Sequence, residues 1–515
     1  MLARTLRSLF AAPLLAGLTL PATAQSSSAP PPPDQQTYTL HINTRIVLTD
    51  VTVTDSHGNI ISNLPQSDFQ VYDNNRPQTL TSFQEHVQTP DIAPAVAPTA
   101  ANVYTNASML HLPSTVNVIL IDTTTIRLTD QMYLYQQLTK FVQELPAGEP
   151  VAIFNRAGQA TLLLQDFTSD HQLLLTAVRR AVPRFRSYDA PYTTGSDTLI
   201  QIDAYLKQVP GRKNVLWFSG GSNAFLQLDP IDEPERRFIY DMLEADRIAL
   251  YPIDARGLTV NFATYRAYQQ MLMQQDADTT GGHAYMNNNG LAKIASHVIS
   301  TDGSYYTLTY SPDDVTRDGK WHNVKVKLND SSYHLSYRHG YYDDGRIDQT
   351  PQAKPRNLLL PNGQVLRNTD DRATPIIFHA RILPASLAPP ATASATSAVK
   401  PRRGDTAYDV HYDIPANSIH ARSQSGNNGL DILGAGIIAF SHDGTPLAHL
   451  YQQVKLTVNE TAIQANPNAT LQFDQQINIP TGQDYLSVVV WDMTTGRTGT
   501  LNLPLNVQKQ PKPKP

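Results

Sequence analysis

The sequence predicts a doubly wound α/β domain flanked by β-sandwich domains. Between residues 114 and 301, continuous apolar runs such as VNVILI alternate with segments whose apolar residues recur at helical spacing. On either side of that region, short segments alternate apolar and polar residues between turn signals, as half-buried antiparallel strands do. Strands alternating with helices indicate a parallel sheet covered by helices, whereas the flanks indicate separate β layers.

The first 24 residues have the layout of a secretory signal peptide. Arg4 and Arg7 precede an apolar stretch from Leu9 to Leu20, which the small-residue triplet Ala22-Thr23-Ala24 follows. The stretch is shorter than the ~20 apolar residues of a spanning helix. We therefore expect cleavage after Ala24 and export to the periplasm or the cell exterior. No later segment is long and apolar enough to cross a bilayer, so no membrane span is expected in the mature chain.

The composition excludes several classes of protein. The chain contains no cysteine, which rules out disulfides, thiolate metal sites and cysteine nucleophiles. The formal net charge is −5, and no long basic run precedes the Pro-Lys tail, so a nucleic-acid partner is not expected. About 490 residues remain after cleavage of the signal, enough for roughly three domains.

Polar and proline-rich stretches divide the chain into these domains. Segments of this composition cannot bury enough apolar surface to pack, so we expect flexible connections there. They are a lead-in at residues 25–37, linkers at 88–113 and 346–374, an insert near 384–405 and a tail at 508–515. The insert lies inside residues 375–507, whose short strands and glycine-rich turns predict a C-terminal β-sandwich.

The α/β region spans residues 114–301. Its expected strands are the apolar runs at residues 116–121, 151–155, 161–164, 215–219 and 248–254. Its expected helices lie at residues 134–145, 173–178, 199–206, 235–245 and 291–299. Pro146 stops the first of these helices.

Residues 38–87 and 302–345 are expected to form strands on the two flanks of the α/β region. Each segment is too short for an independent core, so we expect both to contribute to one β-sandwich. The first strand carries two alternating apolar pairs, offset by one residue, which predicts a bulge. These residues are Ile46, Leu48, Val51 and Val53.

The chemistry is expected at the carboxyl ends of the parallel strands, where such sheets bind ligands. Three loops follow strands or lie between elements there: DTTTI at 122–126, YTTG at 192–195 and SGGSN at 219–223. Carboxylate and hydroxyl oxygens on converging loops are the ligands of a hard cation such as Mg²⁺. Asp197 and Asp254 are further carboxylates expected near these loops.

In this order, the three loops resemble the metal-ion-dependent adhesion site of von Willebrand factor A domains, whose first loop reads Asp-x-Ser-x-Ser. Asp122 matches the acidic residue, Thr124 the first hydroxyl and Thr194 the threonine of the second loop. Ile126 replaces the second hydroxyl and Gly220 the second carboxylate, so two of five ligand positions are missing. The resemblance therefore implies a degenerate site in which Asp122 caps its loop and Mg²⁺ binds weakly, and we expect no cofactor.

The resemblance extends beyond the loops. Residues 44–85, 280–310 and 484–505 are similar to the VWFA-related proteins abundant in Acidobacteria, and the similarity covers nearly the whole mature chain. Members of that group are defined by sequence and largely lack an assigned activity. The resemblance therefore implies fold and export rather than a particular role.

We expect an exported, non-enzymatic adhesion or scaffold protein that binds another protein through the loop carrying Ser219 and Ser222. A hydrolase using Asp122 and Ser222 stays open as an alternative, because GGSNA after a buried strand resembles a nucleophile elbow without its last glycine. A purely structural envelope component is the third alternative. It would differ from the first in lacking a specific, saturable partner.

Overall fold

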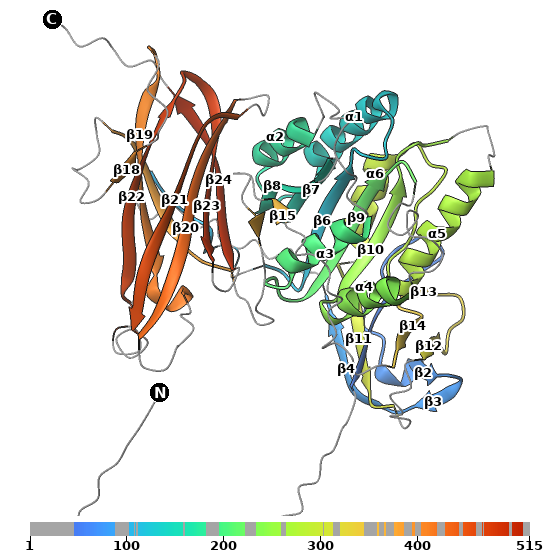
Figure 1. Cartoon of the computed structure of the whole chain (residues 1–515). Coiled ribbons are helices and arrows are strands. Elements are labelled where there is room, and N and C mark those ends of the chain that lie inside the picture. The colour runs from blue at the N-terminus through green and yellow to red at the C-terminus, as the bar shows by residue number, and fades with distance from the viewer. Residues whose placement is uncertain are drawn as a thin grey trace, which may run out of the picture. The chain divides into compact units, whose positions relative to one another are not determined.

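The computed structural model shows a mixed α/β chain with more strand than helix (Figure 1). The residues it describes are 46–87, 102–107, 109, 112–157, 160–181, 195–221, 233–258, 264–301, 303–312, 320–343, 358–359, 365–366, 375–385, 394–396, 403–419, 428–441, 446–459, 466, 468–493 and 497–507. The predicted signal peptide, lead-in and tail lie outside these residues. None of the helices in this described part is long and apolar enough to cross a membrane.

The central sheet has the strand order β10-β9-β6-β7-β8-β15-β16. Its strands are β6 (Thr115–Asp122), β7 (Val151–Ala157), β8 (Ala160–Thr168), β9 (Arg212–Ser219), β10 (Ile248–Asp254), β15 (Leu358–Leu359) and β16 (Val365–Leu366). β10, β9, β6 and β7 run parallel to one another, and β8 pairs antiparallel with β7. The four parallel strands therefore end at one common edge.

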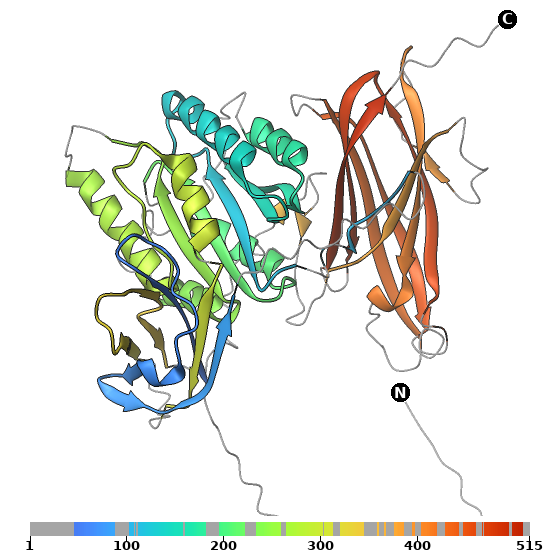
Figure 2. The ribbon, with the colours of Figure 1, turned by 180° about the vertical axis from the view of Figure 1, so that it is seen from behind.

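Helices cover both faces of this sheet (Figures 1 and 2). They are α1 (Leu128–Glu144), α2 (His171–Ala181), α3 (Gly195–Leu206), α4 (Glu233–Ala245), α5 (Thr264–Thr280) and α6 (Leu291–Thr301). Successive side chains of a strand point to opposite faces. Leu120 of β6 accordingly packs in a core with α3 and α4, whereas Ile119 and Ile121 pack in a second core with α1, α2 and α6.

Strands from before and after the α/β region pair with each other in two four-stranded sheets. One has the order β13-β1-β11-β4 and the other β14-β12-β2-β3. The strands from the first flank are β1 (Val47–Thr54), β2 (Phe69–Asp73), β3 (Arg76–Gln78) and β4 (Leu80–His86). Those from the second are β11 (Tyr305–Tyr310), β12 (Trp321–Leu328), β13 (His334–Tyr337) and β14 (Gly340–Tyr342). They share one apolar core, which we call the flanking sandwich.

The first strand of the flanking sandwich differs from its predicted pattern. β1 pairs with β11 from Val47 to Val51 in continuous register, and its buried side includes Val47, Val51 and Val53. Ile46 and Leu48 are exposed. The polar Thr49 is buried between Val47 and Val51 on the same face of β1. A prediction from apolar residues alone was therefore wrong about which face is buried at the start of this strand.

Two further sheets form the C-terminal sandwich, with the orders β18-β22-β19-β17-β5 and β21-β20-β23-β24. Its strands are β5 (Val103–Thr105), β17 (His379–Pro384), β18 (Ser394–Thr396), β19 (Thr406–Pro415), β20 (Asn428–Ser441), β21 (Pro446–Asn459), β22 (Thr470–Ile479), β23 (Gly482–Asp492) and β24 (Thr498–Val507). Four short strands, β5, β15, β16 and β18, come from segments whose composition predicted linkers. Three of them pair with a longer strand, β5 with β17, β15 with β8 and β18 with β22, and β16 pairs with β15.

Candidate functional site

The parallel strands bring four polar side chains to one edge of the central sheet. Arg156 on β7 pairs in register with Asp122 on β6, and Ser219 on β9 pairs with Asp254 on β10. Since β6 and β9 are also neighbours, the four residues lie on adjacent strands where those strands end. We call this region, with the following residues 123–126, 220–221 and 255–258, the carboxyl edge.

Asp122 is fully buried, and both of its carboxylate oxygens have partners. Arg156 Nη1 donates to Asp122 Oδ2 at 2.7 Å, and the side chain of Arg156 is itself buried. Asp122 Oδ1 accepts hydrogen bonds from the backbone N–H groups of Thr124 at 3.1 Å and Thr125 at 3.2 Å. The negative charge of Asp122 is therefore matched by a guanidinium inside the chain, and the carboxylate caps the loop that follows it.

Two hydroxyl groups of this loop, those of Thr123 and Thr124, point toward the backbone of Arg156. Thr123 Oγ1 donates to the carbonyl oxygen of Arg156 at 2.9 Å and Thr124 Oγ1 to the same oxygen at 3.3 Å. Gln131 on α1 donates from Nε2 to the carbonyl oxygens of Thr123 at 3.2 Å and Ile126 at 2.8 Å. The loop is thus fastened by backbone and side-chain hydrogen bonds at both of its ends.

The two positions that depart from the adhesion-site pattern cannot accommodate the expected ligand side chains, for structural reasons. Ile126 is fully buried in the core with residues of α1, so a hydroxyl group there would enter an apolar environment. A Cβ atom at Gly220 would lie 2.2 Å from the carbonyl oxygen of Thr125, and the Gly220 N–H donates to Thr125 Oγ1 at 3.0 Å. The close approach of these two loops therefore requires glycine at position 220.

These residues do not fit a divalent cation. Mg²⁺ needs near-octahedral oxygen ligands, whereas the carboxylate of Asp122 is engaged by Arg156 and the loop amides, and the guanidinium would repel a second cation. Thr194 lies outside the described residues. Within the parts of the chain that the structure describes, no three His, Cys, Asp or Glu residues are placed to hold a metal ion.

Asp254 is the second buried carboxylate at the carboxyl edge. Arg256 binds it with two nitrogen atoms, at 2.8 Å to Oδ1 and 2.9 Å to Oδ2. Arg266 and Gln270 on α5 each donate to Oδ2 at 3.2 Å. Burial alone would raise the pKa of Asp254, but the hydrogen bonds and charge of Arg256 outweigh it and lower the pKa below its usual value. Asp254 therefore stays ionised and ties α5 to the edge.

The other residues singled out from the sequence have different positions. Ser219 lies at the end of β9, but its side chain is buried, so it does not form part of the exposed surface. Asp197 lies in the first turn of α3. Ser222 lies outside the described residues.

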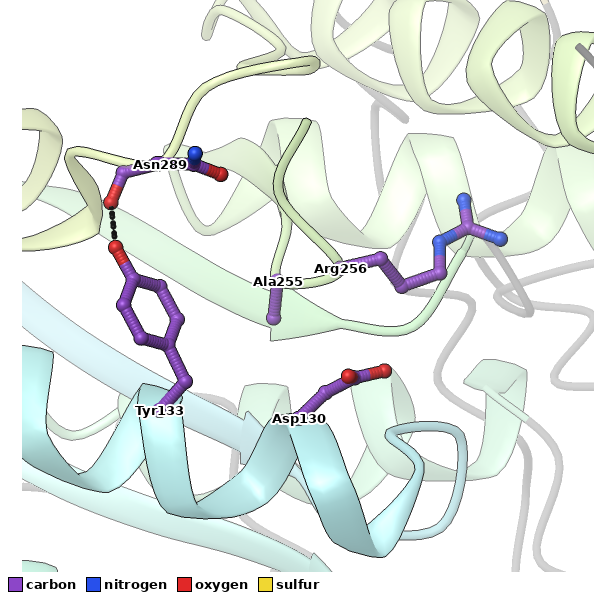
Figure 3. Close-up of a pocket in the computed structure, with 5 residues that line it drawn as sticks. All are labelled: Asp130, Tyr133, Ala255, Arg256 and Asn289. Carbon is purple, nitrogen blue, oxygen red and sulfur yellow. Dashed lines mark hydrogen bonds between the residues drawn. The ribbon is translucent and has the colours of Figure 1, made fainter. Parts of the chain in front are cut away.

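An open pocket of about 230 Å³ adjoins the carboxyl edge (Figure 3). Its walls come from α1 and from the loops after β10 and before α6. The lining residues are Asp130, Tyr133, Ala255, Arg256 and Asn289. The hydroxyl of Tyr133 donates to the carbonyl oxygen of Asn289, which links α1 to the opposite wall. None of these five residues was singled out from the sequence, because no local motif connects residues so far apart in the chain.

Exposed apolar side chains are concentrated on two segments that lead away from the carboxyl edge. Of twelve large hydrophobic side chains exposed among the described residues, six lie between residues 128 and 132 or between 258 and 271. They are Leu128, Met132, Leu258, Tyr265, Tyr268 and Met271, with between 50% and 64% of each side chain exposed. We call these six residues the exposed apolar group.

No family model matches the sequence, and no curated protein matches it either. Among solved structures, the chain is similar to a von Willebrand factor type A protein from Catenulispora acidiphila, with 11% identity and a TM-score of 0.28 over 45% of this chain and 70% of that one. It is also similar to the pilus adhesin SpaC from Lactobacillus rhamnosus GG, with 8% identity and a TM-score of 0.28 over 75% of this chain and 56% of the adhesin. The human COPII-coat protein Sec24c gives 9% identity and a TM-score of 0.25 over 45% of this chain and 44% of that protein.

Proposed function

We propose that this protein is an exported, non-enzymatic scaffold or adhesion protein, and that a von Willebrand factor A-like α/β domain binds another protein beside its carboxyl edge. The sheet order β10-β9-β6-β7-β8, with four parallel strands and helices on both faces, supports a doubly wound domain of that type. The layout of residues 1–24 supports export.

The observation that carries the proposal is the position of the exposed apolar group. Six large apolar side chains on two segments leave apolar surface in contact with solvent, and exposed apolar surface is typical of protein-binding sites. Tyrosine and methionine are among the residue types enriched at interfaces. Tyr265 and Tyr268 lie on the same two turns of α5 as Arg266 and Gln270, which hold Asp254. Their helix is therefore fixed in place before any partner arrives, which reduces the entropy lost on binding.

The state of Asp122 supports a non-enzymatic role. A general base must present a free lone pair within hydrogen-bond reach of its substrate. Both carboxylate oxygens of Asp122 instead accept hydrogen bonds from Arg156 and from loop amides, and the residue is fully buried. This leaves the hydrolase alternative without the carboxylate that it would use beside Ser222.

The test is capture of a partner from an envelope extract by the immobilised mature chain, followed by titration with the purified partner. Replacing Tyr265 and Tyr268 with serine should weaken saturable binding at least about tenfold, as expected for interface hot spots. The matched control replaces Leu447 and Tyr451 with serine. Both are exposed residues on β21 of the C-terminal sandwich, and this variant should bind the partner like the wild type. Equal binding by both variants would place the interface elsewhere, and the absence of any saturable partner would favour a purely structural envelope role.

A further inference from the structure

We infer that Arg156 is a built-in cation of the carboxyl edge: its guanidinium holds in place the carboxylate and the loops that a divalent ion would hold at an adhesion site of the type this edge resembles. The loops therefore keep their shape without any metal ion. This inference concerns the architecture of the edge. Only its consequence for binding, that a partner binds equally well in the presence of a chelator, rests on the proposed function.

The first reason is that Arg156 contacts the two groups that correspond to metal ligands. Its guanidinium lies 2.7 Å from Asp122 Oδ2, and its carbonyl oxygen accepts the hydroxyl of Thr124 at 3.3 Å. The parallel register of β6 and β7 places Arg156 directly beside Asp122, so the pair follows from strand pairing rather than from a flexible side chain. The guanidinium thus takes the place of the cation at the carboxylate, and the backbone carbonyl of the same residue holds the first hydroxyl by accepting its hydrogen.

The second reason is burial. Asp122 has no exposed surface and Arg156 is only 2% exposed, so each charge depends on the other for compensation. A guanidinium is covalently part of the chain and, unlike a bound ion, cannot dissociate from it. The charge at this edge is consequently independent of the concentration of divalent ions.

The third reason is that the loops are linked through this pair. Asp122 Oδ1 accepts the amides of Thr124 and Thr125, and the hydroxyl of Thr125 accepts the amide of Gly220 at 3.0 Å. The chain of contacts therefore runs from Arg156 through Asp122 to the loop after β9. Loss of the guanidinium should weaken the hydrogen bonds of these three amides first, because their acceptors depend on the position of Asp122.

The experiment measures hydrogen exchange at the amides of Thr124, Thr125 and Gly220 in the mature chain. In the wild type, we expect the same protection with Mg²⁺, with Mn²⁺ and with EDTA. In Arg156→Ala, exchange at these amides should accelerate, and methylguanidinium, which restores the missing group, should slow it again. Methylguanidinium should have no effect on the double variant Asp122→Asn/Arg156→Ala, which has no carboxylate to bind it.

Arg338→Ala is the matched control. Arg338 is a mostly buried arginine that pairs with Glu244 at 3.4 Å, outside the carboxyl edge. The Arg338→Ala substitution should lower the free energy of unfolding without selectively accelerating hydrogen exchange at the amides of Thr124, Thr125 and Gly220. The inference is overturned if Arg156→Ala shows the same exchange pattern as Arg338→Ala, because Arg156 would then contribute only general stability.

Calorimetry on the unmodified mature chain gives a second test that does not depend on a folded variant. Titration with Mg²⁺ or Mn²⁺ should release no saturable heat. Saturable binding that Asp122→Asn abolishes would show that a metal ion, and not Arg156, occupies the carboxylate, and would overturn the inference. Failure to find a protein partner would contradict the proposed function alone, because neither test uses a partner.

Discussion

Asp50 on β1 and Arg247 between α4 and β10 form a two-pronged ion pair that joins the flanking sandwich to the α/β domain. Arg247 Nη2 lies 2.8 Å from Asp50 Oδ1, and Nε lies 3.2 Å from Oδ2. Thr307 on β11 donates to Asp50 Oδ1 at 2.7 Å, and Arg212 Nη1 lies 3.9 Å from Oδ2. Only 9% of the Asp50 side chain is exposed, so its charge depends on these partners. The contact ties the first flank of the chain to the domain inserted after it.

Replacing Asp50 with asparagine should therefore lower the free energy of unfolding by roughly 3 kcal/mol, because it removes the carboxylate charge that Arg247 and the buried Arg212 face. Urea unfolding followed by circular dichroism measures this loss. Lys140→Ala is the control, since its pair with Glu144 at 3.9 Å is about half exposed on both sides. That variant should change stability by less than about 0.5 kcal/mol. Equal effects of the two substitutions would contradict the role of Asp50.

Stability at acid pH should depend on Asp254. Its pKa is lowered, so the stability that it contributes is present above its ordinary value of 3.8 and is lost as the pH falls through the lower folded-state value. Asp254→Asn should cost roughly 3 kcal/mol at neutral pH, because Arg256 and Arg266 lose their counter-charge. The difference between the variant and the wild type should shrink below about pH 4. Unfolding curves at several pH values test this, and a difference independent of pH would contradict it.

The sequence indicated the broad fold because its strongest patterns are those that burial imposes. VNVILI and VLWFS are almost entirely apolar since β6 and β9 are covered on both faces. These runs predict an α/β fold, and the structure confirms a mixed α/β chain. The strands β5, β15 and β18 have only two or three residues, too few to show any alternation. Each forms only because a longer strand offers it a partner, which is information that a local pattern does not contain.

The candidate site was predictable only in part. Asp122 and Thr124 stood out because they follow a buried strand in a recognisable loop. Arg156, which contacts both, lies 34 residues from Asp122 and reaches it only through the register of β6 and β7. The one signal in the sequence is an arginine directly after the strand predicted at residues 151–155. The sequence pattern makes Gly220 a missing ligand, whereas the structure shows that the absence of a side chain there permits the approach of Thr125.

Restoring the adhesion-site residues should not create a metal site. Gly220→Asp would place a Cβ atom 2.2 Å from the Thr125 carbonyl oxygen, so we expect a loss of about 1–3 kcal/mol in unfolding free energy and no gain in Mg²⁺ binding. Ile126→Ser, which truncates a fully buried side chain, should cost at least about 2 kcal/mol, whereas Ile126→Val should cost about 1 kcal/mol. Chemical denaturation and calorimetry measure both properties. Saturable Mg²⁺ binding by Gly220→Asp would show that the loops can separate.

Asp166 should behave in the opposite way to Asp254. It is buried on β8 and accepts hydrogen bonds from the hydroxyls of Tyr205 and Thr500. Burial raises its pKa, although these hydrogen bonds lower it in part. For a raised pKa, the contribution to stability is greatest below the ordinary value of 3.8 and declines as the pH rises through the folded-state value.

Asp166→Asn should consequently be more stable than the wild type at neutral pH, by on the order of 1 kcal/mol, because an amide has no charge to bury. Its oxygen can still accept from Tyr205, and its nitrogen can donate to the Thr500 hydroxyl. Asp166→Ala should instead lose about 2 kcal/mol, since it removes the hydrogen bonds from Tyr205, Thr500 and the Phe167 amide. Urea unfolding from about pH 4 to pH 8 distinguishes these cases, because the advantage of asparagine should grow with pH. An asparagine variant that is less stable by the same amount at every pH would mean that Asp166 carries no buried charge at neutral pH.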